Sequence, residues 1–161
     1  MKTSVLFITV LLNALSTGFF FAWSVSVILG TKKVGHFTYL ETMQNINREI
    51  LNPAFFIVFF GSLISLIITT CLQFYNKPMF WLILASTIIY TIGTFGSTAF
   101  GNIPLNNELD ALNITGISLT ELKNFRSYYE NTWNYYHSIR SISNMISFIL
   151  LLIATFTQKI F

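Results

Sequence analysis

The residue types best suited to chemistry occur in one short stretch near the end of the chain. Trp133, His137, Arg140 and Asn144 are separated by four, three and four residues, so a continuous helix places them in one stripe. The imidazole of His137 can transfer a proton, and the guanidinium of Arg140 can hold an oxyanion or an enolate. The stripe therefore predicts a site that generates or binds an organic anion.

The same stripe also has a structural interpretation. Trp133 and Tyr136 could anchor a helix at the membrane interface, while Arg140 extends towards water and pairs with a carboxylate such as Glu130. An arginine that faced lipid would instead be costly, and ionisable groups at membrane depth are functional candidates by default. The residues alone leave the two interpretations open.

Two clusters of carboxamides lie beside apolar runs and are the other candidates. The first is Gln44-Asn45-Ile46-Asn47-Arg48, and the second runs from Asn102 to Asn107. Asparagine beside a helix end usually caps the helix or satisfies a loop. From the residues alone, capping is the preferred role for both clusters.

These candidates must be positioned by helices in a membrane. Only 9% of the residues are charged and 53% are hydrophobic, against about 25% charged in a typical globular protein. Four runs carry no charge, at 3–31, 50–76, 78–107 and 141–158, and each is near or above the length of about 18 residues that indicates a membrane helix. We expect an all-α, four-helix transmembrane bundle, one membrane domain over 1–161, with spans near 4–29, 53–75, 79–99 and 137–158.

The connections predict an elaborated end of the bundle. Apolar residues at spacings of three and four between 36 and 51 predict an amphipathic helix that lies on the membrane surface or caps the bundle. Asn52-Pro53 is typical of a helix start, and Asn76-Lys77-Pro78 is a tight turn between spans two and three.

The segment after span three predicts a change of structure. The run from Gly101 to Asn107 indicates an ordered loop, and Ser118 or Thr120 can cap a helix that continues into the last span. Gly93 and Gly96 are small enough to allow close approach of helices in lipid.

Several classes of protein are excluded or left without support. The net charge of +3 is scattered, so nucleic acid is not an expected partner. Only His36, His137 and Cys71 are available as soft metal ligands, which predicts no metal and no cofactor; a haem between the two histidines is formally possible, but His36 follows a glycine in an expected loop.

The first apolar run is too long for a signal peptide, so we expect it to remain in the mature protein as a membrane helix. The bias towards Asn, Lys, Ile and Phe suggests a bacterial inner membrane, whereas the distribution of Lys and Arg leaves the orientation open.

Read in order, the three polar clusters resemble the anthrone-oxygenase-like family of small integral membrane proteins. The residues that carry this resemblance are Met43-Gln44-Asn45-Ile46-Asn47-Arg48 running into Asn52-Pro53-Ala54-Phe55, then Gly101-Asn102-Ile103-Pro104-Leu105-Asn106, then Trp133 with His137 and Arg140. The resemblance extends back to the Gly18–Trp23 region. It implies a four-helix membrane bundle, and its fungal members are associated with cofactor-free oxidation of an anthrone to an anthraquinone.

The resemblance implies His137, Arg140 and Asn47 as catalytic residues. It implies Asn102, Asn106 and Trp133 as substrate-binding residues. In the enzyme hypothesis, His137 removes a proton from a hydrophobic small molecule, and the resulting anion reacts with oxygen. The competing hypothesis is a non-catalytic membrane protein, structural or ligand-binding, whose polar residues lock the helices together. The expected partners are the lipid bilayer and a hydrophobic small molecule; the oligomeric state stays open.

Overall fold

The computed structural model describes residues 2–157, which form helices and their connections without a β-strand. Four helical rods, Lys2–Thr31, Pro53–Leu72, Lys77–Ala111 and Leu119–Thr157, have mean hydropathies of 2.0, 2.4, 1.6 and 1.8 and are long enough to cross a membrane. The protein is therefore a multi-pass membrane protein, and the predicted all-α, four-helix transmembrane bundle is confirmed.

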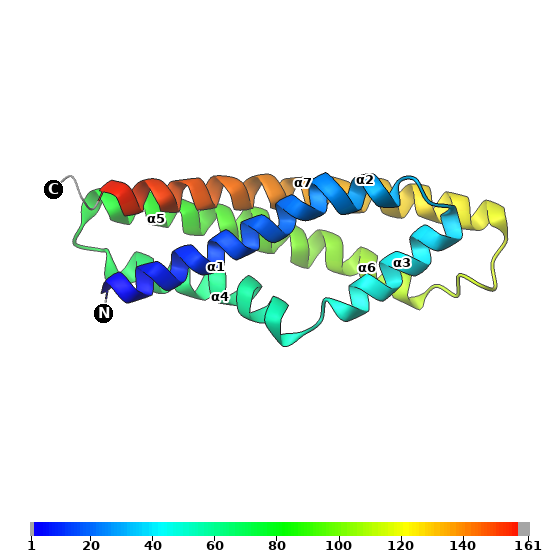
Figure 1. Ribbon diagram of the computed structural model, residues 1–161, viewed down its shortest axis with the longest axis horizontal. Helices are drawn as coiled ribbons and strands as arrows, with labels where there is room; N and C mark the ends of the chain where they lie inside the picture. Colours follow the sequence, from blue (N-terminus) through cyan, green and yellow to red (C-terminus); the bar gives the residue numbers. More distant parts are fainter. Residues whose placement is uncertain (1, 158–161) are drawn as a thin grey trace.

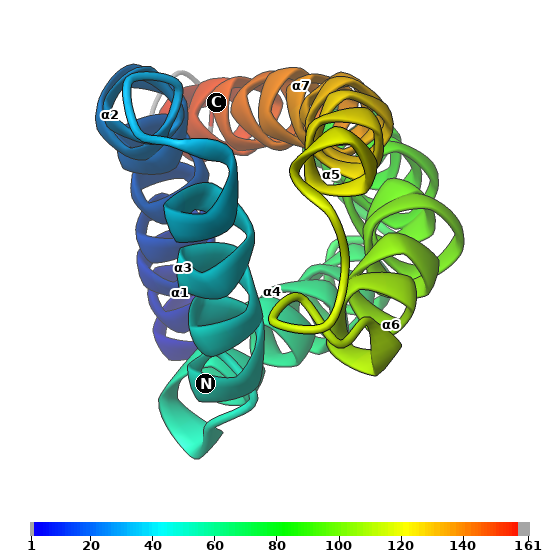
Figure 2. The same ribbon diagram turned by 90° about the vertical axis from the view of Figure 1, so that its right-hand side faces the viewer.

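The rods run in alternating directions and close into a ring (Figures 1 and 2). Helix α1 (Lys2–Ala22) packs against α4 (Pro53–Leu72) and α7 (Leu119–Thr157), and α5 (Lys77–Ile89) packs against the same two helices. The start of α1, the α4–α5 turn and the end of α7 lie at one end of the bundle. The connections at the other end are longer: the one between the first two rods contains a helix, and 112–118 between the last two rods is turn and coil.

Hydroxyl and amide groups join the rods inside the bundle. Thr9 lies 2.7 Å from Thr69, and Ser86 lies 2.9 Å from Ser147, each pair oxygen to oxygen. Asn144 accepts from Thr17 at 2.6 Å. The hydrophobic effect does not drive helices together in lipid. Small polar residues instead stabilise the bundle, because they let helices approach closely and form hydrogen bonds between them.

The elaborated end is closed by α3 (His36–Glu49), which packs on α6 (Ile103–Ala111) and α7. The predicted amphipathic helix is therefore present, and it caps the bundle with Tyr39, Leu40 and Met43 buried. Burial, reinforced by the nearby Glu130 carboxylate, raises the pKa of Tyr39, so this phenol stays protonated.

Arg126 ties the connection before α3 to the last helix. Its Nη1 donates to the Val34 carbonyl oxygen at 2.6 Å, and its Nη2 donates to the carbonyls of Thr31 and Lys32 at 3.3 Å each. Its Nε donates to Glu130 at 2.9 Å. The connection is thus held by a buried, fully engaged guanidinium.

The predicted helix starts agree with the structure. Asn52 caps α4 by accepting from the Phe55 amide at 3.0 Å, with Pro53 in the first turn. Ser118 precedes α7, and its backbone N–H donates to the Glu121 carboxylate at 2.8 Å, which is half of a capping box.

The predicted loop from Gly101 to Asn107 is wrong. The third rod instead continues through π-helical segments, Tyr90–Gly96 and Thr98–Asn102, into α6. Pro104 cannot donate to the preceding turn, and the widened π-helical turn before it accommodates this loss without ending the helix.

A helical rod can extend beyond the bilayer, so its limits need not be those of a membrane span. The second rod ends at Leu72, the third reaches Ala111, and the fourth begins at Leu119, as expected for a helix that starts near Ser118 and continues into the last span. The predicted end of the last span, Gln158, lies outside the described residues.

Glycines set the closest approach between the third rod and α7. A Cβ added at Gly93 would collide with the side chain of Ser143, and one added at Gly101 would collide with the ring of Tyr136. The predicted packing role of Gly93 is confirmed. A Cβ added at Gly96 would meet only the Thr91 carbonyl of its own rod, at 3.5 Å, so no close approach to another helix depends on this glycine.

Candidate functional site

A cavity of about 110 Å³ lies where α3 meets the ends of the rods, and we call it the polar pocket. Its polar lining residues are Asn47, Thr98, Asn102, Asn106, Trp133 and Arg140, and the remainder of its wall is aromatic or aliphatic. Five of the six residues predicted for the site therefore line one cavity. His137 does not line it and lies behind Arg140.

Arg140 places a buried positive charge in the wall of this pocket. Only 7% of the residue is exposed, and its Cζ lies 4.8 Å from the ring centroids of both Phe20 and Trp133. Aromatic faces attract a cation but do not cancel its charge. Within residues 2–157 no carboxylate lies at ion-pair distance from the Arg140 guanidinium, and Glu130 pairs with Arg126 instead. The predicted Arg140–Glu130 pair is wrong, and the charge remains available to an anion.

His137 holds this guanidinium in place. Its Nδ1 accepts from Nε and Nη2 of Arg140 at 3.1 and 3.0 Å. Its Nε2 lies 2.9 Å from the Ser24 hydroxyl, which donates its own proton to the Phe20 carbonyl. The neutral imidazole with its proton on Nε2 satisfies all of these contacts. Trp133 stacks on the ring with centroids 5.1 Å apart and planes at 8°.

Tyr129 connects two asparagines of the polar pocket that come from different helices. Asn47 Nδ2 donates to the Tyr129 hydroxyl at 3.1 Å, and that hydroxyl donates to Asn106 Oδ1 at 3.1 Å. Asn106 Oδ1 also accepts from Trp133 Nε1 at 2.9 Å. Helix α3, the third rod and α7 are thereby joined around the pocket, and the amide orientation of Asn106 is set by two donors.

Asn102 leaves one buried polar atom without a partner. Its Nδ2 donates to the Trp133 carbonyl at 3.1 Å, whereas its Oδ1 has no hydrogen-bond partner in a residue that is 1% exposed. An unmade hydrogen bond of this kind is costly in a folded protein. Asn102 and Arg140 both belong to the pocket wall, so an acceptor without a partner and a cation lie beside a ligand in the pocket.

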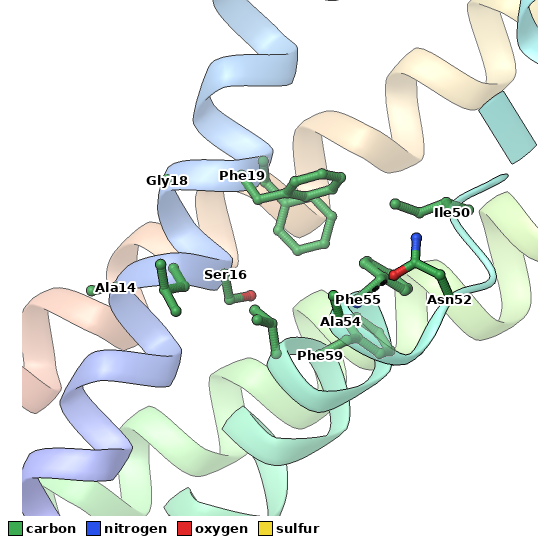
Figure 3. Close-up of a pocket in the computed structure, with 12 residues that line it drawn as sticks. Ala14, Ser16, Gly18, Phe19, Ile50, Asn52, Ala54, Phe55 and Phe59 are labelled. Atoms are coloured by element: carbon green, nitrogen blue, oxygen red, sulfur yellow. Dashed lines mark hydrogen bonds between the residues drawn. The ribbon is translucent and has the colours of Figure 1, made fainter.

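A larger cavity of about 550 Å³ lies between α1 and α4, and we call it the apolar cleft (Figure 3). Its wall includes Ala14, Ser16 and Gly18 of α1 with Asn52, Ala54 and Val58 of α4 and its cap. It shares five residues with the polar pocket: Phe19, Phe20, Ile50, Phe55 and Phe59. The two cavities therefore lie side by side and share part of their wall.

Metal ligands do not gather in the part of the chain that the structure describes. No group of three or more His, Cys, Asp or Glu side chains there is placed to hold an ion. The groups that surround the polar pocket are a guanidinium, amides, an indole and aromatic rings, which suit an organic anion better than a cation.

Sequence reasoning missed Tyr129, Ser24 and Phe20. Tyr129 lies four residues before Trp133, so extending the stripe by one helical turn would have included it. No local pattern marks Ser24 or Phe20, because both meet His137 and Arg140 from a different rod.

Comparison with known proteins gives one match. A family model described as anthrone oxygenase matches residues 43–150, which is more than half of the chain and includes all six predicted site residues. No curated protein and no solved structure matches the chain significantly.

Proposed function

The chain belongs to the anthrone oxygenase family, and from this premise we propose that its polar pocket binds a hydrophobic ring ketone or phenol as an oxyanion and oxidises it with molecular oxygen. The observation that carries the proposal is Arg140, a buried guanidinium beside a cavity with no carboxylate partner among the described residues. Such a charge lowers the free energy of an enolate more than that of the neutral ketone.

The proposed reaction begins when the ketone oxygen binds Arg140 and the guanidinium turns its N–H groups towards it, which releases Nδ1 of His137. The freed Nδ1 then removes a ring methylene proton, and the resulting enolate is held by Arg140. Asn47 donates a further hydrogen bond to the anion through its amide, and Asn102, Asn106 and Trp133 orient the ring. These roles extend the predicted ones, because His137 first positions Arg140 and only then serves as the base.

The enolate supplies the electrons that reduce oxygen. One electron passes to O₂, the two radicals combine at the ring carbon, and the proton held by His137 completes a hydroperoxide. Loss of water from the hydroperoxide leaves the second carbonyl. One ketone and one O₂ thus give one dicarbonyl product and one water, with no external reductant.

Oxygen uptake with anthrone as the probe tests the proposal. The purified protein in detergent should accelerate oxygen consumption and formation of 9,10-anthraquinone above the spontaneous rate, with one O₂ used per product. An Arg140→Gln preparation of equal thermal stability should return to the spontaneous rate. Equal rates with and without the wild-type protein would refute catalysis on this substrate class.

A non-catalytic ligand-binding protein is the second candidate. It is favoured by the bonds that tie Asn47, Tyr129, Asn106 and Trp133 into one interhelical network, since such a network is also a structural lock. Binding of 4-ethylphenol to the wild-type protein without any accelerated oxidation of anthrone would support this function instead.

The compositional bias that suggests a bacterial chain supports placing the protein in the bacterial inner membrane. A ligand dissolved in that bilayer would have direct access to the rods.

A further inference from the structure

We infer that the ligand of the polar pocket is elongated, with an oxygen-bearing ring at Arg140 and an apolar portion that lies in the apolar cleft. The inference rests on the proposed function and adds the shape of the ligand. It follows from the sizes, the linings and the shared wall of the two cavities.

The polar pocket is too small for a complete ligand. Its volume is about 110 Å³, whereas small-molecule sites are typically ~300 to 1,000 Å³ and a cavity of ~150 Å³ accepts one benzene ring. The apolar cleft, at about 550 Å³, lies within the range of ligand sites. The polar pocket therefore holds at most one ring, and the other rings or the chain of a larger molecule need the cleft.

The cleft wall is apolar in practice, although Ser16 and Asn52 belong to it. Ser16 Oγ already accepts from Asn144 at 2.7 Å. Asn52 accepts from the Phe55 amide and donates to the Glu49 carbonyl at 2.7 Å. Both polar groups are occupied by the protein, so hydrocarbon in the cleft leaves none of them without a partner.

Small residues keep the cleft open between α1 and α4. The two helices touch further along, where a Cβ on Gly61 would lie 3.2 Å from Leu12, and they diverge towards the start of α4 (Figure 1). Gly18 lies in the diverging part, and a Cβ there would meet nothing within 4 Å. Figure 3 shows the α1 residues of the lining, Gly18 among them, on one side of this space and Ala54 and Phe55 of α4 on the other.

Aromatic side chains separate the cleft from the polar pocket. Phe19 and Phe55 belong to both linings, and their ring centroids lie 5.8 Å apart. Phe20 also belongs to both, and Arg140 lies over its ring. A molecule that lies along the cleft thus reaches the guanidinium by passing these rings.

The test compares binding of 4-octylphenol and 4-ethylphenol by calorimetry in one detergent. Gly18→Leu should weaken 4-octylphenol binding by about tenfold or more, because several methylenes lose their burial, and should leave 4-ethylphenol binding unchanged. Ala54→Leu, which fills the cleft from α4, should act in the same direction. Gly30→Leu is the matched control, since Gly30 also has open space around it but lies outside both linings.

The outcomes separate this inference from the proposed function. If Gly18→Leu and Ala54→Leu both bind 4-octylphenol as the wild type does, or weaken both phenols equally, the elongated ligand is wrong while the function stands. A phospholipid that occupies the cleft in the purified protein and is not displaced by 4-octylphenol would also overturn the inference. Failure of the wild type to bind either phenol would overturn both. A selective loss of 4-octylphenol supports the inference.

Discussion

Arg140 donates two hydrogen bonds to a single atom, Nδ1 of His137, at 3.1 and 3.0 Å. A buried arginine is usually neutralised by a carboxylate, because an unpaired buried charge is strongly destabilising. Here the partner is an imidazole that orients the guanidinium without cancelling its charge. An oxyanion in the polar pocket can therefore replace His137 as the acceptor and gain the full attraction of the cation.

Replacement of Arg140 should remove binding of anions. Arg140→Gln should weaken binding of the phenolate form of 4-ethylphenol by about tenfold to 100-fold, as expected for a charged hydrogen bond of ~1.5 to 3 kcal/mol. Calorimetry at alkaline pH measures the change. Arg48→Gln is the control, because Arg48 pairs with Asp110 at the surface and such pairs contribute little. Equal affinities for wild type and Arg140→Gln would contradict the site.

Two substitutions of His137 should separate its positioning role from its role as a base. In His137→Gln the amide oxygen can still accept from Arg140, so 4-ethylphenol binding should persist while anthrone oxidation falls by about 100-fold or more, as for loss of a general base. In His137→Leu both binding and oxidation should fall. Wild-type oxidation rates in His137→Gln would assign this residue to positioning alone.

The vacant acceptor on Asn102 should create a preference for hydroxyl donors. The wild type should bind 4-ethylphenol more tightly than 4-ethylanisole by about tenfold, which corresponds to one hydrogen bond in a buried site. Asn102→Ala should abolish this preference, although it also loses the bond to the Trp133 carbonyl. The ratio of the two affinities is the readout, so that a general loss of affinity does not count. An unchanged ratio would refute the prediction.

A methyl group at Gly93 should destabilise the bundle through its collision with Ser143. Gly93→Ala should cost about 1 to 3 kcal/mol, the usual range for overpacking, and should lower the melting temperature in detergent. Gly93→Ala combined with Ser143→Gly should recover part of the loss, whereas Gly30→Ala should be neutral or stabilising. Additive effects of the two changes would show that these residues do not meet.

Loss of Arg126 should free the connection before α3. In Arg126→Gln, the carbonyls of Thr31, Lys32 and Val34 lose their donor, and the half-buried Glu130 loses its partner. Trypsin should then cut at Lys32 and Lys33 several times faster, because local opening governs cleavage. Arg48→Gln should leave the cleavage rate unchanged. Equal rates in both variants would contradict the role of Arg126 as a clamp.

Features that depend only on residues close together in the sequence were predictable from it. The four rods follow from the uncharged runs, since the penalty for a charge in lipid applies to each residue separately. Asn52-Pro53 and Ser118 mark helix starts through contacts within one turn. The stripe from Trp133 to Arg140 follows from helical periodicity alone.

Features that depend on other rods were not predictable in this way. The spacing of His137 and Arg140 places them on one face of α7, but contacts with Ser24 and Phe20 decide which of them reaches the polar pocket. The continuous third rod was missed because Gly101, Asn102 and Pro104 are locally typical of a turn. Tertiary packing of Gly101 against Tyr136 overrides that preference.

The π-helical segments of the third rod set the direction of the side chains that follow them. Each widened turn accommodates an additional residue within the helix, and one residue corresponds to about 100° of rotation in a regular α-helix. The direction in which Asn102 and Asn106 point is therefore set by how many residues precede them in the rod. A deletion of a single residue between 90 and 100 would preserve composition and hydropathy, yet would turn both asparagines away from Trp133. The number of residues in the third rod, and not only their identity, therefore determines the direction of Asn102 and Asn106.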